Sequence, residues 1–418
     1  MMQAEPNVPT PTAERIPALD VLRGFAVLGI LIVNIQSFSM IGAAYFNPTA
    51  YGDLTGINRW AWLATHVLAD NKFMTIFSIL FGAGILLLTR RVDESGGSPA
   101  AVHYRRTLGL LVIGAIHAYL FWYGDILVWY GLCALLVYLF RKCSPKTLAV
   151  VGIICIAIPS LLYLLFAWSV PYWPPEAYQQ MLRDWKPQAQ IVEMELSAYR
   201  GGWLEQMQHR LPESIKMHTI AFLFWASWRA GGLMLLGMAL LKWGVLTGRR
   251  SRRFYAVLGI AGPGIGLPVI IYGVVRNFEA GWSLEYSRFV GSQFNYWASL
   301  LVAMGYISLV MLSIQSVRPG PITRALSAVG RTALSNYLMQ TLLCTSIFYG
   351  HGLGLFGQVE RGGQVLTVLG IWLLQSIISV VWLKHFQFGP AEGLWRSWTY
   401  QKWQPLKISS CDSDSNRE

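Results

Sequence analysis

Long apolar runs alternate along this chain with short polar breaks that are mostly basic. Runs of roughly 18 to 25 apolar residues are long enough to cross the hydrocarbon core of a bilayer as helices. Sorting the runs against the charged breaks predicts about ten spans, within a range of about nine to twelve. They lie near residues 18–40, 70–89, 106–123, 125–140, 147–168, 217–241, 255–275, 293–314, 327–349 and 364–383. The predicted fold is an all-α, polytopic bundle of transmembrane helices.

Composition agrees with this class, because 54% of the 418 residues are hydrophobic and only 13% are charged. A cleaved signal peptide is not expected, since residues 1–17 are polar with Arg15 as their only base and the apolar run that follows is too long. The cysteines predict neither a disulfide framework nor a metal site. They are Cys133, Cys143, Cys155, Cys344 and Cys411.

The positions of the basic residues predict the orientation, because short cytoplasmic loops retain Lys and Arg. With the N-terminus inside, most basic residues fall in cytoplasmic loops and the tail, so we expect both termini inside. These residues are Arg90, Arg91, Arg105, Arg106, Arg141, Lys142, Lys146, Arg249, Arg250, Arg252, Arg253, Arg318, Arg324, Lys384, Arg396, Lys402 and Lys407. The net charge of +12 then interacts with anionic lipid head groups, and no nucleic acid partner is expected.

The longest break divides the chain into two halves of five spans each. The expected parts are a cytoplasmic segment 1–17, a first half 18–168, an external loop 169–216, a second half 217–384 and a cytoplasmic tail 385–418. Within the loop, apolar residues recur at three- and four-residue intervals over 192–211, which predicts one amphipathic helix. This helix either caps the bundle at the outer leaflet or forms a lid over an external site.

Four polar residues fall at a similar depth near the outer ends of predicted spans: Asn34, Lys72, His117 and Asp125. Ionisable groups inside a bilayer are costly and therefore mark candidate functional sites. A histidine beside a carboxylate suits general base catalysis, and a lysine or asparagine nearby could stabilise an oxyanion. The structural alternatives are a histidine bonded to a neighbouring helix and a lysine that extends to the interface.

Further candidates lie in other spans. Arg229 is in the middle of a span, where it needs an anionic partner such as Asp125 or a phosphate or carboxylate of a substrate. Asn336 and Gln340 lie four residues apart on one helix face and serve either as interhelical hydrogen bonds or as ligand contacts. Asp20 and Arg23, three residues apart, can pair at the mouth of the first span.

Several sequence patterns of known catalytic sites are absent. The chain has no Walker A sequence, no HExxH and no GxSxG elbow. The glycine-rich stretch 262–266 lies within an apolar span without a preceding strand, so it indicates packing or a kink. Neither an ATP-driven pump nor a metal enzyme is predicted.

Separated motifs together resemble one family. They are the opening Leu19-Asp20-Val21-Leu22-Arg23-Gly24 with Asn34, Lys72-Phe73 leading to Phe81-Gly82-Ala83-Gly84, His117 ahead of Gly124-Asp125-Ile126-Leu127, the stretch from Gly330-Arg331 to Gln340, and Phe388-Gly389-Pro390-Ala391-Glu392-Gly393-Leu394-Trp395-Arg396. Over residues 15–403 the chain resembles the YeiB family of bacterial inner-membrane proteins, which carry a C-terminal domain of unknown function. The resemblance implies a multi-pass protein of the bacterial inner (plasma) membrane.

The opening motif is also similar, more distantly, to that of transmembrane acyltransferases such as the lysosomal heparan-alpha-glucosaminide N-acetyltransferase. This similarity implies transfer of an acyl group from a cytoplasmic acyl-CoA-type donor to an acceptor across the membrane. The catalytic histidine of the lysosomal enzyme follows its first span, where this chain reads Asn47-Pro48-Thr49-Ala50-Tyr51-Gly52. His117 is therefore the candidate base.

The leading hypothesis is a membrane acyltransferase. In it His117 is the general base, Asp125 orients it, Lys72 and Asn34 act on the acceptor or oxyanion, and Arg23 lies near the donor entrance. The alternative is a transporter or binding protein for a small anionic solute, held by Arg229 and the same polar groups. A third hypothesis is an accessory factor without a ligand. The expected partners are membrane lipids and an unidentified small substrate, with a homo-oligomer left open.

Overall fold

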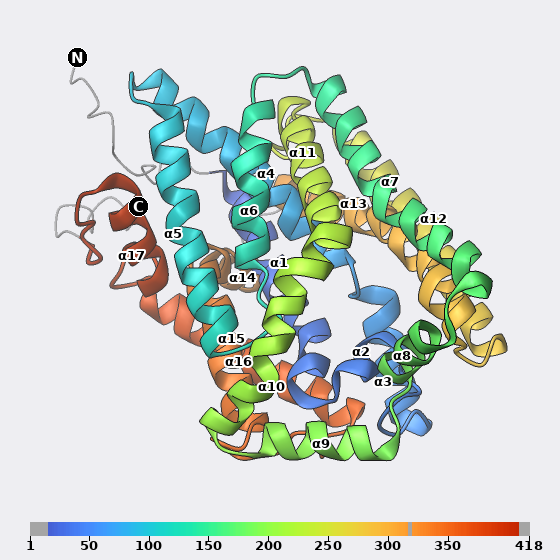
Figure 1. The fold of residues 1–418 in the computed structure, drawn as a ribbon. Helices are drawn as coiled ribbons and strands as arrows, with labels where there is room; N and C mark the ends of the chain where they lie inside the picture. Colours follow the sequence, from blue (N-terminus) through green and yellow to red (C-terminus); the bar gives the residue numbers. More distant parts are fainter. Residues whose placement is uncertain (1–15, 317–319, 409–418) are drawn as a thin grey trace.

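A computed structural model describes residues 16–316 and 320–408, so Arg318, Cys411 and most of the segment 1–17 lie outside the described residues. Every regular element among those residues is a helix, apart from an isolated antiparallel bridge between Phe386 and Lys407 (Figure 1). The all-α prediction is therefore confirmed.

Seventeen α-helices follow one another along the described chain. They are α1 (Pro17–Ser39), α2 (Gly42–Phe46), α3 (Gly56–Leu68), α4 (Lys72–Glu94), α5 (Pro99–Leu120), α6 (Leu127–Val137), α7 (Pro145–Ser169), α8 (Pro175–Trp185), α9 (Ala189–Arg200), α10 (Trp203–Lys216), α11 (Ser227–Lys242), α12 (Arg252–Glu279), α13 (Ser292–Ser316), α14 (Pro321–Arg331), α15 (Ala333–Phe348), α16 (Arg361–Trp382) and α17 (Pro390–Tyr400). Two π-helical segments, Met217–Ala226 and Leu284–Gly291, lead into α11 and α13.

Seven helical stretches in the described chain are long and apolar enough to cross a membrane. They are Pro17–Ser39, Gly56–Glu94, Pro145–Tyr172, Trp203–Lys242, Arg252–Glu279, Leu284–Gln315 and Arg361–Trp382. The apolar stretch Leu127–Phe140 is shorter. Each of the predicted spans contains a helix, and the number that cross the membrane stays a prediction.

Two predicted spans differ from the helices that contain them. The span expected at 327–349 is divided into α14 and α15, because Thr332 leaves the helical conformation at φ −114° and ψ 34°. The hydroxyl of Thr332 bonds the carbonyl of Ala328 at 3.0 Å, at the end of α14 and within the expected span. The span expected from 217 begins earlier, since helical structure runs without a break from Trp203 to Lys242.

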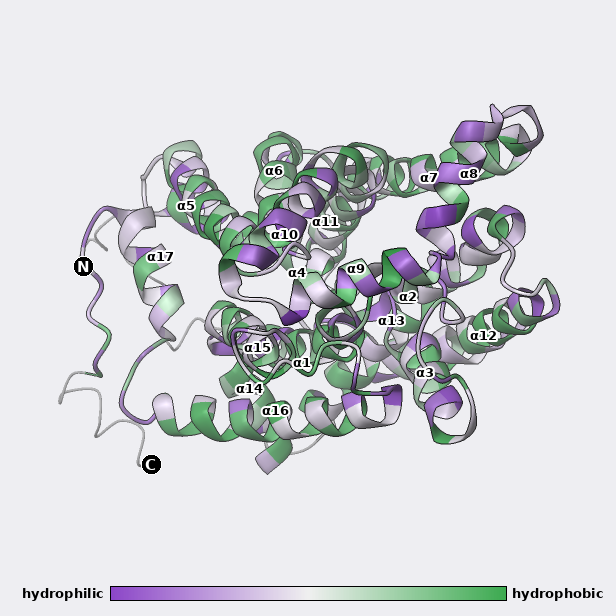
Figure 2. Cartoon of the chain, turned by 60° about the horizontal axis from the view of Figure 1, so that its bottom comes forward, coloured by the Kyte–Doolittle hydropathy of each residue, from purple (hydrophilic) through white to green (hydrophobic). Residues whose placement is uncertain are grey.

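The external loop also differs from its prediction. Instead of one amphipathic helix over 192–211, it contains α8, α9 and α10, with a break at Gly201 and Gly202. The extended backbone of Gly202 starts a new helix, and its N–H donates to the Glu205 carboxylate at 2.7 Å, as in a capping box. Figure 2 shows hydrophilic residues along α8, α9 and α10, whereas α16 is largely hydrophobic.

Helix α1 lies at the centre of the bundle and packs against α4, α13, α14, α15 and α16. It approaches α14 at backbone contact distance, because a Cβ atom on Gly24 would overlap the carbonyl oxygen of Leu326, and one on Gly330 would overlap that of Asp20. Small residues permit such close packing in membrane helices. This contact fixes the start of α1, which carries Asp20 and Arg23.

The loops gather at two ends of the bundle. At the first, which we call the basic end, Trp395 donates to the carbonyl of Arg106 at 2.7 Å and Lys242 donates to that of Cys143 at 2.6 Å. At the second, the opposite end, α10 covers the end of α5 and packs against α9. Basic loops predicted to be cytoplasmic thus meet at one end, and the inside orientation of that end stays a prediction.

Candidate functional site

His117 lies on the last turn of α5, close to Asp125 in the short connection to α6. The imidazole Nδ1 is 2.6 Å from Asp125 Oδ2, and the two side chains are only 4% and 0% exposed. A carboxylate can only accept, so Nδ1 donates the hydrogen and the neutral ring presents its lone pair at Nε2. The structure therefore brings together the two residues predicted to be catalytic.

Asp125 also caps the start of α6. Its Oδ1 accepts a hydrogen bond from the backbone N–H of Val128 at 2.8 Å, in the first turn of α6. Satisfying a free N–H at a helix start fixes the position of the carboxylate. One oxygen thus caps α6 while the other orients the imidazole.

The other imidazole nitrogen meets α15. Nε2 of His117 is 2.8 Å from Oγ1 of Thr341, a buried residue that was not predicted from the sequence. The ring of Tyr337, one turn earlier, lies 5.2 Å from the imidazole. The available signal was the four-residue spacing of Tyr337 and Thr341, which places both on one helix face. We call His117, Asp125 and Thr341 the hydroxyl–imidazole–carboxylate site.

Lys72 belongs to a separate cluster. Its Nζ donates to Asn295 Oδ1 at 2.6 Å and to the carbonyl of His66 at 2.9 Å, and the residue is fully buried. Asn295 in turn donates to Asp70 at 2.7 Å. Lys72 therefore does not extend to the interface, and no hydrogen bond or ion pair joins it to His117 in the part of the chain that the structure describes.

Arg229 does not pair with Asp125. Its guanidinium donates to the carbonyl of Tyr296 at 3.2 Å and to Oγ of Ser299 at 3.0 Å, and it lies 4.1 Å above the Tyr296 ring. It is fully buried, its Nε has no hydrogen-bond partner, and no carboxylate lies within ion-pair distance among the described residues. Lys72 and Asp70 both lie within electrostatic range, so two cations and one carboxylate share this region.

The remaining candidates are dispersed. Asn34 is half-buried and makes no side-chain hydrogen bond to a residue that the structure describes. Asn336 donates to Ser379 at 2.9 Å, and Gln340 donates to Gln375 at 3.1 Å, so both connect α15 to α16. These amide contacts fit interhelical hydrogen bonding.

Asp20 and Arg23 form the predicted pair at the start of α1, with 2.8 Å between Oδ1 and Nη1. They lie at the basic end, far along α1 from Asn34. Over the described ranges, no three His, Cys, Asp or Glu side chains are grouped closely enough to hold a metal ion.

A carboxylate at the opposite end has an unusual environment. Glu195 on α9 accepts the backbone N–H of Gly42 at 2.9 Å and lies 3.9 Å from His209. Burial raises the pKa of Glu195 to about 7, and the nearby charge of Glu213 contributes in the same direction. This side chain therefore changes charge near neutral pH.

Comparison with known proteins gives relatives of nearly full length. The chain is 33% identical over 388 residues to the uncharacterized protein YeiB of Escherichia coli (strain K12), covering 92% of this chain and 96% of that protein. It is 33% identical over 421 residues to the uncharacterized protein YxaH of Bacillus subtilis (strain 168), covering 95% of this chain and 97% of that protein. No solved structure matches.

A family model described as a protein of unknown function, DUF418, matches residues 240–402. This region contains α12 to α17 and so includes Thr341 and the amide contacts between α15 and α16. The coverage and identity of the relatives extend the similarity to the first half of the chain. The protein therefore belongs to the YeiB family of helical, membrane-type proteins.

Proposed function

We propose that this protein is an acyltransferase of the bacterial inner membrane, which moves an acyl group from a cytoplasmic acyl-CoA-type donor to an extracytoplasmic acceptor. One observation carries the proposal: His117 is held between the carboxylate of Asp125 and the hydroxyl of Thr341. A hydroxyl, an imidazole and a carboxylate in this order are the groups that acyl transfer uses to move a proton.

In the proposed reaction, Nε2 of His117 takes the proton from the hydroxyl or amine of the acceptor. The acceptor atom forms a bond to the thioester carbonyl carbon, the carbon–sulfur bond breaks, and the imidazolium returns its proton to the leaving thiolate. Asp125 holds the ring in the tautomer with Nδ1 protonated and stabilises the imidazolium. Because Thr341 occupies Nε2, the proton passes through its hydroxyl or the acceptor replaces it.

Tyr337 is a candidate to stabilise the oxyanion. Its hydroxyl oxygen accepts the N–H of Ile126 at 3.2 Å, which leaves its own hydrogen available for donation beside the imidazole. Access would involve α10, since Arg210 and Ser214 bond the carbonyls of Phe121 and Ala118 at 2.7 and 2.9 Å. These bonds fit a lid that covers the end of α5.

The test compares His117→Gln and Asp125→Asn with the matched variant His351→Gln, which changes an exposed histidine at the same end. Membrane vesicles containing each protein receive isotope-labelled acetyl-CoA, and mass spectrometry measures free CoA and labelled products. Loss of a general base lowers the rate by about 10²- to 10⁴-fold, so the first two variants should lose transfer and the third should retain it. Equal transfer by His117→Gln and the wild type would refute the proposal.

A second candidate function is a transporter for a small anionic solute. Arg229 favours it, because its buried guanidinium has an unpartnered Nε and no carboxylate within ion-pair distance among the described residues, and a bound anion would supply both. Under this function, Arg229→Gln abolishes uptake of labelled solutes while His117→Gln leaves uptake intact and no acylated product forms. The two functions therefore predict opposite sensitivities for the same pair of variants.

A further inference from the structure

The guanidinium of one arginine at the basic end stacks on an aromatic ring and has no hydrogen-bond acceptor among the residues that the structure describes. The guanidinium of Arg106 lies 3.8 Å above the ring of Trp395, whose Nε1 donates to the Arg106 carbonyl at 2.7 Å. No hydrogen bond or ion pair joins this guanidinium to another residue in the part of the chain that the structure describes. The stacking holds the group in place without using its N–H donors.

Two further arginines lie around it. Arg23 of α1 and Arg396 of α17 are within electrostatic range of Arg106, and Arg396 lies 4.9 Å above the ring of Phe388. Arg23 keeps 34% of its side chain exposed while it pairs with Asp20. Three helices from distant parts of the sequence thus bring three guanidinium groups to one place.

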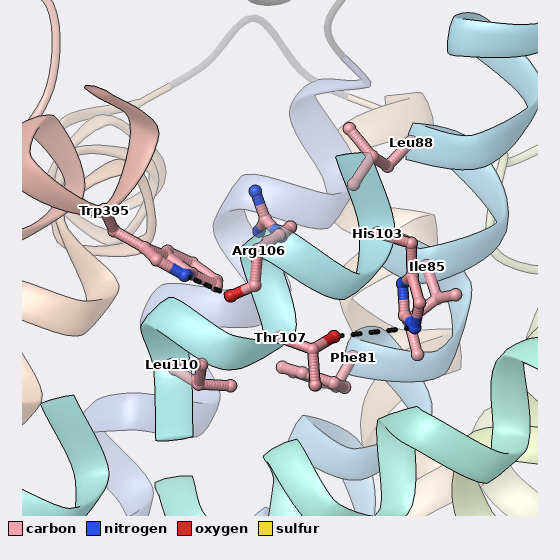
Figure 3. A pocket seen from close by; sticks show the side chains of 8 residues that line it. All are labelled: Phe81, Ile85, Leu88, His103, Arg106, Thr107, Leu110 and Trp395. Atoms are coloured by element: carbon pink, nitrogen blue, oxygen red, sulfur yellow. Dashed lines mark hydrogen bonds between the residues drawn. The ribbon is translucent and has the colours of Figure 1, made fainter. Parts of the chain in front are cut away.

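Two carboxylates nearby are already engaged by other groups. Asp20 pairs with Arg23, and Glu392 of α17 accepts the N–H groups of Leu334 and Ser335 at the start of α15, at 2.7 and 3.2 Å. Figure 3 shows Arg106 and Trp395 beside a small cavity that is also lined by His103. Its volume of about 10 Å³ suits one water molecule, so a phosphate group would lie outside this cavity.

We propose that Arg23, Arg106 and Arg396 form a phosphate-binding site at the basic end, which takes the phosphate groups of coenzyme A. Guanidinium groups bind phosphate through paired, charge-assisted hydrogen bonds, and several of them together suit a ligand with several phosphates. The inference that the site binds phosphate follows from the arginines alone. The inference that the phosphate belongs to coenzyme A rests on the proposed acyl transfer. An anionic lipid head group offers the same chemistry.

The experiment measures coenzyme A binding by titration calorimetry on the full-length protein in nanodiscs of zwitterionic lipid. The variants are Arg106→Gln, Arg106→Lys and Arg396→Gln, and the control is Arg253→Gln, an exposed arginine at the start of α12. We expect binding at least about tenfold weaker for both glutamine variants, partial recovery with lysine, and no change for the control. Binding should also weaken as salt rises.

A second arm replaces part of the lipid by phosphatidylglycerol. Phosphatidylglycerol should compete for the arginines and weaken coenzyme A binding. Undetectable coenzyme A binding in zwitterionic discs would overturn the assignment to coenzyme A. Equal coenzyme A affinity in the wild type and both glutamine variants with unchanged Tm would overturn the site itself. His117→Gln should bind coenzyme A as the wild type does. Loss of transfer in His117→Gln therefore tests the acyltransferase proposal, and loss of binding in the arginine variants tests the phosphate-binding site.

Discussion

The polar residues of the candidate sites are held partly by neighbours in sequence and partly by residues from distant parts of the chain. His117 and Asp125 are eight residues apart across one tight reversal, so a local reading of the sequence could place them together. Thr341 is 224 residues from His117, and Asn295 is 223 residues from Lys72. Such contacts depend on how helices assemble, which hydrophobic periodicity does not encode.

Matching depth also proved to be a weak guide to contact. Asn34, Lys72, His117 and Asp125 were predicted at one level. Of these four residues, however, Lys72 bonds Asn295 of α13 and Asn34 makes no side-chain hydrogen bond to a described residue. Depth fixes one coordinate, while the rotation of each helix decides which neighbour a side chain meets.

Glu195 gives a pH prediction at the scale of one residue. Its pKa is about 7 in the folded protein against an ordinary 4.5, so folding binds a proton within this window. The free energy of unfolding therefore falls as pH rises from about 4.5 to 7. Glu195→Gln should match the wild type near pH 5 and be more stable at pH 8, by at most on the order of 3 kcal/mol.

Thermal unfolding in detergent at pH 5, 6, 7 and 8 checks this difference. Glutamine keeps an oxygen that can accept the N–H of Gly42, so the variant removes the charge and preserves the contact. Glu193→Gln, an exposed neighbour on α9, is the control and should show no pH-dependent difference. A wild type and Glu195→Gln with parallel pH profiles would contradict the assigned pKa.

At the scale of elements, long apolar helices were predicted well and their interruptions were not. α1, α7, α12, α13 and α16 agree with the predicted spans to within several residues, because their length and composition are distinctive. The break at Thr332 and the one at Gly201 and Gly202 come from local backbone and capping geometry. A hydrophobic pattern continues through such breaks and cannot locate them.

The docking of α17 gives an element-scale prediction. Glu392 accepts two backbone N–H groups and the hydroxyl of Ser335 at the start of α15. Its removal in Glu392→Ala leaves buried donors without an acceptor, which costs about 1–3 kcal/mol for each group. For Glu392→Ala we expect a lower Tm and faster proteolysis after α16. Glu392→Gln keeps one acceptor, so its Tm should fall less.

Limited proteolysis followed by mass spectrometry measures the release of the tail directly. Leu394→Ala is a suitable control, since Leu394 lies on α17 and is 62% exposed. This substitution removes apolar surface from α17 and leaves the contact with α15 intact. An intact tail in Glu392→Ala at the wild-type rate would show that other contacts, such as that of Trp395, hold α17.

For the whole molecule, the two ends make the orientation testable. The positive-inside rule places the basic end in the cytoplasm. Asp53→Cys at the opposite end and Arg253→Cys at the basic end both create exposed thiols. In intact cells a membrane-impermeant maleimide should label Asp53→Cys, and it should label Arg253→Cys only after permeabilisation.

The four described native cysteines are buried or half-buried, so their own labelling should be slow and the unsubstituted protein serves as the blank. Labelling of Arg253→Cys before permeabilisation would invert the orientation. It would then place the arginines of the phosphate-binding site outside the cell, where acyl-CoA is absent.

One helix joins the two proposed sites. Arg106 and His117 are both on α5, eleven residues apart by number, which is about three turns and about 16 Å along one face. That distance is roughly half of the 30 Å hydrocarbon core. In a donor anchored at its phosphates, the flexible chain that carries the acyl thioester would therefore be enough to reach the far half of the membrane. In such an arrangement the acyl group travels while the nucleotide stays, and vectorial transfer requires no exchange of the whole protein between inward and outward states.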